Sequence, residues 1–265
     1  MAHLIWYEIL IVVVFASACA MAGALTLIQE IVSICREELR YGLPANHARL
    51  TSGVLGGLAG FGVAALGIYY YLYVALPESW IEWVGRSAYA LILAASTAHL
   101  SVIVHAWRRI RVEEEALGST PSASEAPTLL ARRQAGLRDL RTESDSFTDL
   151  KARDDELITD LIGVIGERLL SGHRALSRIP FYGYLGTVCG ILLMAQELGR
   201  LDEATETFKV LRDMADGLTL AFKTTLIALL AYLPLRKCID ILIGRVGALE
   251  RAWLAMRDDP GSESS

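Results

Sequence analysis

The chain has 265 residues, of which 53% are hydrophobic and 21% are charged, and its formal net charge at pH 7 is −5. Its apolar residues are gathered in long stretches with few charges, which excludes an ordinary soluble domain and indicates a polytopic membrane protein. The small acidic excess is spread along the chain, and no basic patch with interleaved aromatic residues is present, so nucleic-acid binding is not expected.

The first apolar stretch, residues 4–28, is long enough to cross a bilayer. The small residues of its ASACAMA segment would suit signal-peptide cleavage. However, the stretch lacks a positively charged segment before it, and its apolar part is longer than a typical signal core. We therefore expect a retained transmembrane helix, with Glu8 in its first turns, close to the outer headgroups.

The second apolar stretch, residues 50–76, is rich in glycine. Two overlapping GxxxG spacings, Gly53 to Gly57 and Gly56 to Gly60, would let another helix approach closely in lipid. Packing against a neighbouring helix of the same chain explains these glycines more simply than a specific dimer contact does. An aromatic cluster typical of a membrane interface follows: Tyr69, Tyr70, Tyr71, Tyr73, Trp80 and Trp83.

The third apolar stretch, residues 88–107, contains His99 about two turns from its basic end. An ionisable residue inside a membrane helix is a functional candidate. His99 would either relay protons or simply pack against a backbone group. Residues 1–110 are thus predicted to form three N-terminal transmembrane helices.

Basic residues set the predicted orientation. The amino terminus has no lysine or arginine, whereas arginines follow the first and third stretches. The positive-inside rule then places the amino terminus outside and the carboxy terminus in the cytoplasm. The arginines concerned are Arg36, Arg40, Arg49, Arg108, Arg109 and Arg111.

Residues 111–178 are predicted to form a cytoplasmic linker and helical region. The acidic run 113–115 and the Ser/Pro/Ala-rich segment 118–127 are typical of a flexible linker. From residue 129 to residue 176, leucines and isoleucines recur at spacings of three and four, which predicts a helical hairpin or one long helix. This region leads directly into the fourth apolar stretch.

Two more apolar helices form the predicted channel core, residues 179–244, and each has a threonine in its middle. Thr187 is nine residues after Arg178, roughly 13 Å along a helix, and Thr225 is eleven residues before Arg236, roughly 16 Å. Because the two helices run antiparallel, both hydroxyls are expected near the bilayer midplane, where they would line one small pore. The fold class is therefore all-α, a polytopic membrane protein with five transmembrane helices and a helical cytoplasmic region.

Residues 245–265 are predicted to contain the cytoplasmic end of the last helix and a disordered tail. The four cysteines, at positions 19, 35, 189 and 238, show no CxxC spacing and no histidine at ligand spacing, so we expect small buried hydrophobic groups. The sequence has no catalytic triad pattern, phosphate-binding loop or zinc motif. Neither a cofactor nor an enzymatic activity is expected.

Two motifs resemble a known family. The run GYLGTVCGIL, preceded by Pro180, resembles the glycine-flanked threonine motif on the second core helix of the MotA/TolQ/ExbB proton channel family. The run AFKTTLIALLAYLP resembles the final helix of that family, in which a threonine is followed nine residues later by a proline, here Thr225 and Pro234. The TolQ/ExbB branch often has a glutamate five residues before the second threonine, where this chain has Leu220, and Lys223 stands where an apolar residue is usual.

The resemblance implies a homopentamer around single-span helices of a MotB/TolR/ExbD-like partner in the bacterial inner membrane. In that family the partner supplies an aspartate that takes and releases protons, and the threonines of the channel subunit face it. Thr187 and Thr225 would then line the proton pathway, and proton flow would drive mechanical work. Residues expected to support the motifs and helix packing are Pro180, Gly183, Gly186, Gly190, Ala228 and Pro234.

Four residues are candidates for tuning the pathway: Lys223, Thr224, Glu197 and His99. Lys223 lies about 200° around the helix from Thr225. It would snorkel outward or pair with Glu197 or Asp216, or else face the partner's acid. A second hypothesis is a non-conducting membrane scaffold of an envelope complex, which would use the same helices only to assemble the complex. For each threonine taken alone, a hydrogen bond back to its own helix is the simpler explanation.

Overall fold

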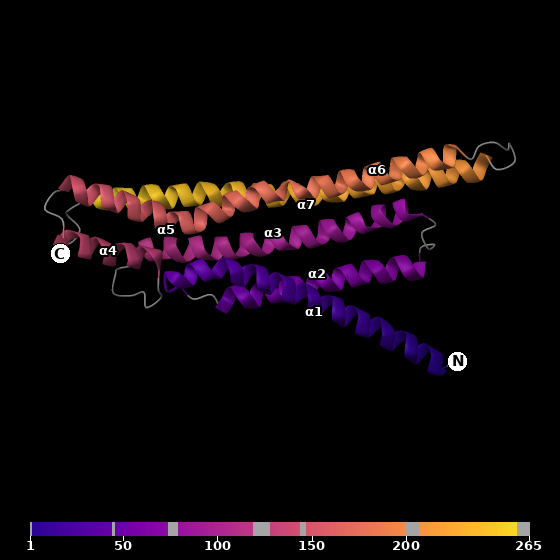
Figure 1. Ribbon diagram of the computed structural model, residues 1–265, viewed down its shortest axis with the longest axis horizontal. Helices are drawn as coiled ribbons and strands as arrows, with labels where there is room; N and C mark the ends of the chain where they lie inside the picture. The colour runs from indigo at the N-terminus through magenta and orange to yellow at the C-terminus, as the bar shows by residue number, and fades with distance from the viewer. Residues whose placement is uncertain are drawn as a thin grey trace. The chain divides into compact units, whose positions relative to one another are not determined.

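The computed structural model describes residues 2–43, 46–73, 79–118, 128–143, 147–199 and 207–258 (Figure 1). These residues form an all-α fold, as predicted, with no strand among them. The helices are α1 (Ala2–Arg40), α2 (Asn46–Tyr73), α3 (Trp80–Gly118), α4 (Leu129–Glu143), α5 (Phe147–Leu176), α6 (Arg178–Leu198) and α7 (Thr207–Asp258).

Four helical segments of the described residues are long and apolar enough to cross a membrane: Leu10–Ser33, His47–Leu72, Trp80–Gly118 and Thr148–Leu198. The last of them includes most of α5 and all of α6, because only a one-residue turn at Ser177 separates these helices. The fifth predicted span, residues 217–234, lies within α7 and remains a prediction.

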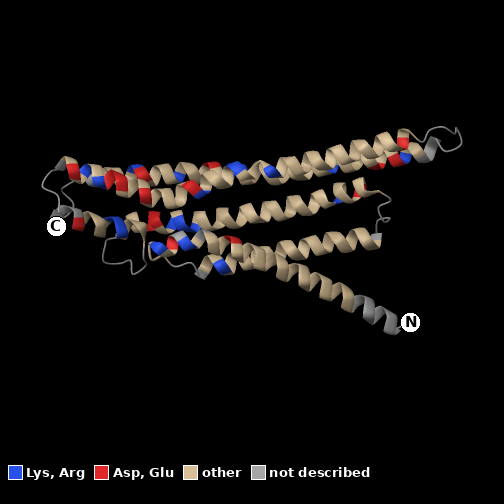
Figure 2. Ribbon diagram, in the orientation of Figure 1, with Lys and Arg blue, Asp and Glu red and all other residues tan. Residues whose placement is uncertain are grey.

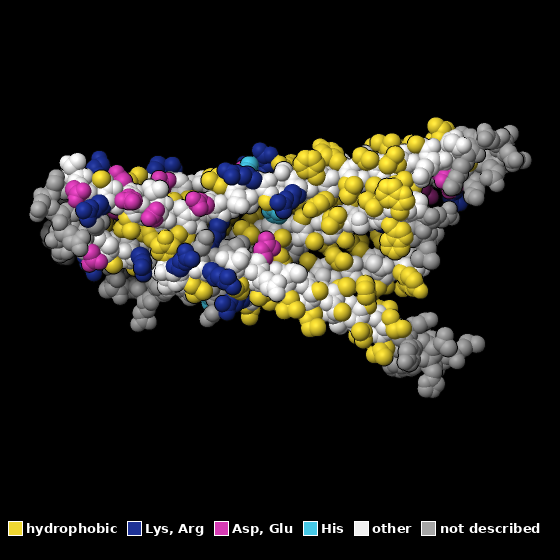
Figure 3. Space-filling view, viewed as in Figure 1, with side chains coloured by type: hydrophobic (Ala, Val, Ile, Leu, Met, Phe, Trp, Pro, Cys, Tyr) yellow, Lys and Arg dark blue, Asp and Glu magenta, His cyan; other side chains and the backbone are white. Residues whose placement is uncertain are grey.

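The chain divides into two compact units. Unit 1 contains Met1–Gln29, Thr51–Ser101 and Ala175–Arg236, and unit 2 contains Glu30–Leu50, Val102–Arg174 and Lys237–Ser265. Figure 2 shows that most charged residues belong to the segments of unit 2. Figure 3 shows hydrophobic side chains over the surface of the apolar helices, as expected of a surface that faces hydrocarbon.

In unit 1, α1 and α2 approach closely at the GxxxG glycines of α2. A β-carbon placed on Gly56 would lie 2.8 Å from the carbonyl carbon of Gly23, and one placed on Gly60 would lie 2.7 Å from that of Cys19. Only glycine permits such a distance between two helix backbones. The structure therefore shows packing within the chain at these glycines, as the sequence predicted.

The aromatic residues at the ends of α2 and α3 also pack together. The rings of Tyr70 and Tyr89 stack with their centroids 6.4 Å apart, and the guanidinium of Arg86 lies 5.1 Å from the centre of the Tyr70 ring. Trp80 and Tyr71 are mostly exposed. This combination of stacked and exposed rings suits the interface level of a membrane.

In unit 2, the hydrophobic core is built by apolar positions that recur every three or four residues on α5 and α7. The set comprises Ile158, Leu161, Ile165 and Leu169 of α5 and Ile239, Leu242, Val246, Leu249 and Trp253 of α7.

At the end of α1, Gly42 has a φ of 74°, a backbone conformation that favours glycine. The amide of Leu43 donates to the carbonyl of Glu38 over 3.1 Å, which caps the helix.

The prediction of a flexible linker at residues 113–115 is wrong. These residues continue α3 as far as Gly118, and the Glu113 side chain is fully buried. A buried carboxylate is tolerated there because it accepts hydrogen bonds from backbone amides of α4, as described below. The rest of the predicted linker, residues 119–127, and the tail, residues 259–265, lie outside the described residues.

Candidate functional site

Small residues bring α6 and α7 of unit 1 into contact. A β-carbon placed on Gly183 would lie 2.7 Å from Cβ of Ala228, and one on Gly190 would lie 2.8 Å from Cβ of Ala221. Between them, a β-carbon on Gly186 would lie 2.6 Å from Cβ of Thr224. Along this contact the residue numbers rise on α6 and fall on α7. The two helices therefore pack antiparallel along a column of small side chains.

The two predicted pore residues meet in this column. Oγ1 of Thr187 contacts Oγ1 of Thr225, so the hydroxyls lie at the same level along the two helices. Oγ1 of Thr187 is also 3.1 Å from the carbonyl oxygen of Gly183 and 3.2 Å from that of Ala221. Oγ1 of Thr225 lies 3.1 Å from the same Ala221 oxygen. One carbonyl of α7 therefore serves both threonines.

The pair has spare hydrogen-bonding capacity. Each hydroxyl has one proton to donate and two lone pairs to accept with. If Thr187 donates to Gly183 and Thr225 donates to Ala221, both protons are used and lone pairs remain as acceptors. Rotation of either hydroxyl away from its carbonyl makes a donor available instead. The pair can therefore bind either a donor or an acceptor without ionising.

Both threonines are half-buried, and the helix faces that carry them are otherwise apolar and exposed. On α6, Tyr184 and Ile191 flank Thr187 at spacings of three and four residues. On α7, Phe222 and Leu229 flank Thr225 in the same way. The hydroxyl pair thus lies within an apolar surface of unit 1 that a single copy of the chain leaves uncovered.

Thr224, predicted as a tuning residue, is fully buried in the helix contact. Its Oγ1 lies 3.0 Å from the carbonyl oxygens of Leu220 and Ala221, and its side chain packs against Gly186. This position indicates a packing role, because the hydroxyl is satisfied within α7 and does not reach the exposed face.

The other candidate tuning residues do not join the threonine pair. Lys223 is exposed, and among the described residues no ion pair connects it to Glu197 or Asp216. His99 on α3 has Nδ1 2.7 Å from the carbonyl oxygen of Ala95 in its own helix, the arrangement expected of simple packing. Its part in proton transfer stays a prediction.

The two prolines occupy different places in their helices. Pro180 lies in the first turn of α6, where the missing amide proton costs nothing. Pro234 lies inside α7, which continues past it, so the carbonyl of Leu230 loses its usual helical donor.

Of the four cysteines, Cys35 and Cys189 are buried as expected, Cys19 is half-buried, and Cys238 is exposed, contrary to the prediction.

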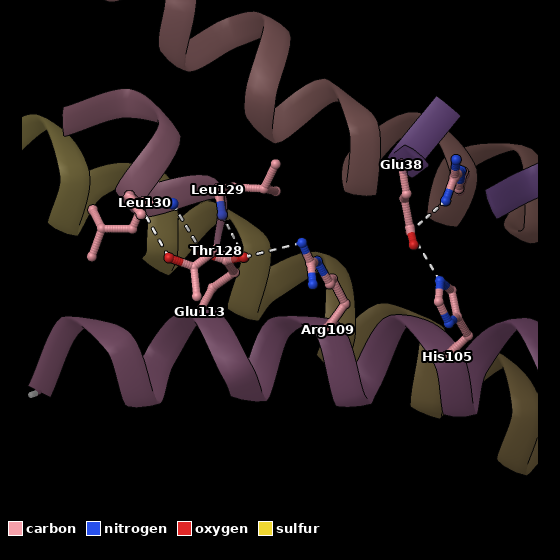
Figure 4. A network of polar contacts seen from close by, with 9 residues as sticks. Glu38, His105, Arg109, Glu113, Thr128, Leu129 and Leu130 are labelled. Atoms are coloured by element: carbon pink, nitrogen blue, oxygen red, sulfur yellow. Dashed lines mark hydrogen bonds and ion pairs between the residues drawn. The ribbon is translucent and has the colours of Figure 1, made fainter. Parts of the chain in front are cut away.

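A second polar cluster, in unit 2, was not found from the sequence. Glu38 of α1 is buried, and its Oε1 accepts a hydrogen bond of 2.9 Å from Nε2 of His105 on α3 (Figure 4). Nη1 of Arg168 on α5 donates to the same oxygen over 2.6 Å. Burial raises the pKa of Glu38, but the His105 hydrogen bond and the positive charges of Arg168 and Arg109 outweigh it and lower the pKa.

A related contact fixes the start of α4. The carboxylate of Glu113 accepts hydrogen bonds from the amides of Leu129, over 2.8 Å, and Leu130, over 3.1 Å, while Nη2 of Arg109 lies 3.6 Å away (Figure 4). Oγ1 of Thr128 accepts from the amide of Ala131, as a helix N-cap does. A carboxylate from another helix therefore completes the capping of α4.

A buried ion pair joins α4, α5 and α7. Arg133 donates through Nε and Nη2 to the two carboxylate oxygens of Asp154, over 3.0 and 2.8 Å, and through Nη1 to the carbonyl oxygen of Trp253 over 2.7 Å. Both charged side chains are almost fully buried. The geometry is bidentate, which is the strong form of this pair.

Comparison with known proteins finds one family. Residues 166–253 match the model of the MotA/TolQ/ExbB proton channel family. The matched segment includes the end of α5, all of α6 and α7 as far as Trp253, and hence both threonines. No curated protein and no solved structure matches the chain.

Proposed function

We propose that this chain, whose residues 166–253 match the model of the MotA/TolQ/ExbB proton channel family, belongs to that family and couples proton flow across the inner membrane to mechanical work. Members of the family are stator-type channel subunits and not enzymes, and they lie in the bacterial inner membrane. Membership also implies a MotB/TolR/ExbD-like partner. The observation that carries the proposal is the contact between the Thr187 and Thr225 hydroxyls on an exposed apolar surface.

In the proposed arrangement, the stretch 217–234 of α7 is the fifth transmembrane span. Large apolar side chains are exposed along it, including Phe222, Leu226, Leu230 and Leu233, as a lipid-facing or partner-facing helix requires. The amino terminus is outside and the carboxy terminus is cytoplasmic, because the arginines flank the cytoplasmic ends of the spans.

The threonine pair would act on an acid that another polypeptide supplies. Near the level of Thr187 and Thr225, the described parts of α6 and α7 contain no carboxylate; Glu197 and Asp216 lie close to the opposite ends from Arg178 and Arg236. A neutral carboxylic acid both donates and accepts a hydrogen bond, and the hydroxyl pair can offer either partner. The pair therefore suits an acid that is protonated and deprotonated in turn.

The apolar faces beside the threonines provide the surface for the partner helix. Tyr184 and Ile191 of α6 and Phe222 and Leu229 of α7 would contact it. Five copies would surround the partner helices, as the family resemblance implies. In this arrangement each copy presents one hydroxyl pair to the centre. The partner's acid therefore meets an equivalent site each time the partner moves from one copy to the next.

The test is proton flux in vesicles that contain the chain together with its single-span partner. We expect the double variant Thr187→Val/Thr225→Val to lose proton flux while still co-purifying with the partner, because valine keeps the shape and removes both hydroxyls. Thr97→Val on α3 is the matched control, since among the described residues Oγ1 of Thr97 donates only to the carbonyl of Leu93 in its own helix.

The scaffold hypothesis predicts a different result. If the chain only assembles a complex, the double variant and the Thr97 control will behave alike in both flux and co-purification. Equal proton flux in the wild type and the double variant would therefore reject the channel role of the threonines and favour a scaffold.

A further inference from the structure

Three side chains of metal-binding chemistry converge in unit 2. Cys35 and Glu38 are three residues apart on α1, so they project from the same helix face. His105 reaches them from α3, and one ligand atom from each of the three residues lies within 4.8 Å of the other two. A thiol, a carboxylate and an imidazole are the three groups that bind Zn²⁺ most often in proteins.

The carboxylate has one oxygen available. Oε1 of Glu38 receives the hydrogen bonds of His105 and Arg168, whereas Oε2 is buried and has no hydrogen-bond partner among the described residues. The Glu38 side chain is 97% buried. An unsatisfied carboxylate oxygen at such depth is costly, and a metal ion beside it removes that cost.

We propose that Cys35, Glu38 and His105 bind one Zn²⁺ ion, with Sγ, Oε2 and Nε2 as ligands. Nε2 of His105 would exchange its hydrogen bond to Oε1 for the metal, while Arg168 remains on Oε1 and orients the carboxylate. A cavity of about 10 Å³ borders Glu38 and His105, which is room for one water molecule as the fourth ligand. Three protein ligands and a water form a familiar tetrahedral zinc site.

The neighbouring arginines determine how tightly the ion is held. The two positive charges of Zn²⁺ are balanced by the Cys35 thiolate and the Glu38 carboxylate. The positive charge of Arg109 lies near a different carboxylate, that of Glu113. Arg168 then shares Glu38 with the metal. The site is therefore weaker than a closed four-thiolate site, and the zinc is removable by a chelator. Its effect is to join α1 to α3 within unit 2.

The experiment uses the full chain purified in detergent, stripped with a chelator and then dialysed against Zn²⁺ or Co²⁺. We expect about one zinc per chain, and with Co²⁺ a sulfur-to-metal charge-transfer band in the near ultraviolet. Cys35→Ala removes the thiolate and leaves the Glu38 hydrogen bonds in place, so it should abolish the band and the bound zinc. His105→Gln should also lose the zinc.

Two matched controls are available. Cys238→Ser changes an exposed cysteine, and His173→Gln changes another histidine of unit 2, which lies 3.6 Å from Asp240. Both variants should retain the zinc and the charge-transfer band. If the wild type binds no more zinc than Cys35→Ala does, or if the band survives in Cys35→Ala, Cys35 is not a zinc ligand and the proposal is wrong.

Discussion

The hydroxyl of Thr187 on α6 contacts the hydroxyl of Thr225 on α7, and both lie within hydrogen-bonding distance of one carbonyl oxygen, that of Ala221. The contact is possible because Gly183, Gly186 and Gly190 let the helix backbones approach. The contact between the hydroxyls therefore depends on the small residues between the helices. Larger side chains at these glycine positions would push the helices apart and separate the hydroxyls.

The first prediction separates the hydroxyl of Thr225 from its methyl group. Thr225→Ser keeps the hydroxyl and should retain most of the proton flux, whereas Thr225→Val should lose it by about tenfold, the equivalent of one hydrogen bond of about 1.4 kcal/mol. Flux in vesicles that contain both the chain and its partner measures the difference. Serine and valine variants with equal flux would show that the hydroxyl is not used.

The second prediction concerns the helix contact itself. Gly186→Ala places a methyl group against the Thr224 side chain, and we expect it to destabilise the protein by about 1–3 kcal/mol, as overpacking does. Gly244→Ala on α7 is the control, because no atom lies within 4 Å of the added carbon there. Thermal unfolding in detergent should show a lower midpoint only for Gly186→Ala. A lower midpoint in both would point to a general effect of alanine.

The helices and the threonine pair were predictable because their signals are local. Apolar stretches of about 20 residues mark membrane helices, and the depth of a residue can be counted from the nearest basic boundary. This counting placed Thr187 and Thr225 at similar depths, and the structure brings their hydroxyls into contact. The glycines of the α6 motif were recognisable because they resemble the glycine-flanked threonine motif of the MotA/TolQ/ExbB family.

The cluster in unit 2 left a weaker signal. Glu38 and Arg168 are 130 residues apart, and nothing in either local sequence indicates the other. The acidic run 113–115 has the composition of a solvated linker, so the burial of Glu113 was missed. A signal was present on α3, where His105, Arg109 and Glu113 recur every four residues and hence share one face. Such a stripe beside an apolar span indicates a buried polar contact.

The third prediction tests the capping of α4. Glu113→Ala removes the acceptor for the amides of Leu129 and Leu130, and we expect a loss of about 1–3 kcal/mol, the cost of leaving buried donors unsatisfied. Glu115→Ala is the control, because its ion pair with Arg111 is exposed and worth at most about 1 kcal/mol. Hydrogen exchange at the first turn of α4 should accelerate only in Glu113→Ala. Unchanged exchange would show that Glu113 does not hold this turn.

The fourth prediction is a pH dependence. The pKa of Glu38 is lower in the folded chain than its ordinary value, so its stabilising effect is present above that value and is lost as pH falls through the lowered pKa. Glu38→Gln should therefore be less stable than the wild type near neutral pH, and the difference should shrink below about pH 4.3, the ordinary pKa of glutamate. Unfolding midpoints of both proteins across acidic pH measure this. A difference that stays constant would show that the Glu38 charge contributes nothing.

The fifth prediction concerns the buried pair of Arg133 and Asp154. Arg133→Met removes both hydrogen bonds to a carboxylate that is fully buried, and we expect a loss of about 3–5 kcal/mol. Adding Asp154→Leu should restore part of it, because the double variant no longer buries a charge, so the two effects will not add. Arg153→Met is the control, since the pair it forms with Asp149 is half-exposed and worth about 1 kcal/mol or less. Additive losses in the double-mutant cycle would mean that the two charges do not interact, and that Arg133 acts through its contacts with the carbonyl and the ring of Trp253.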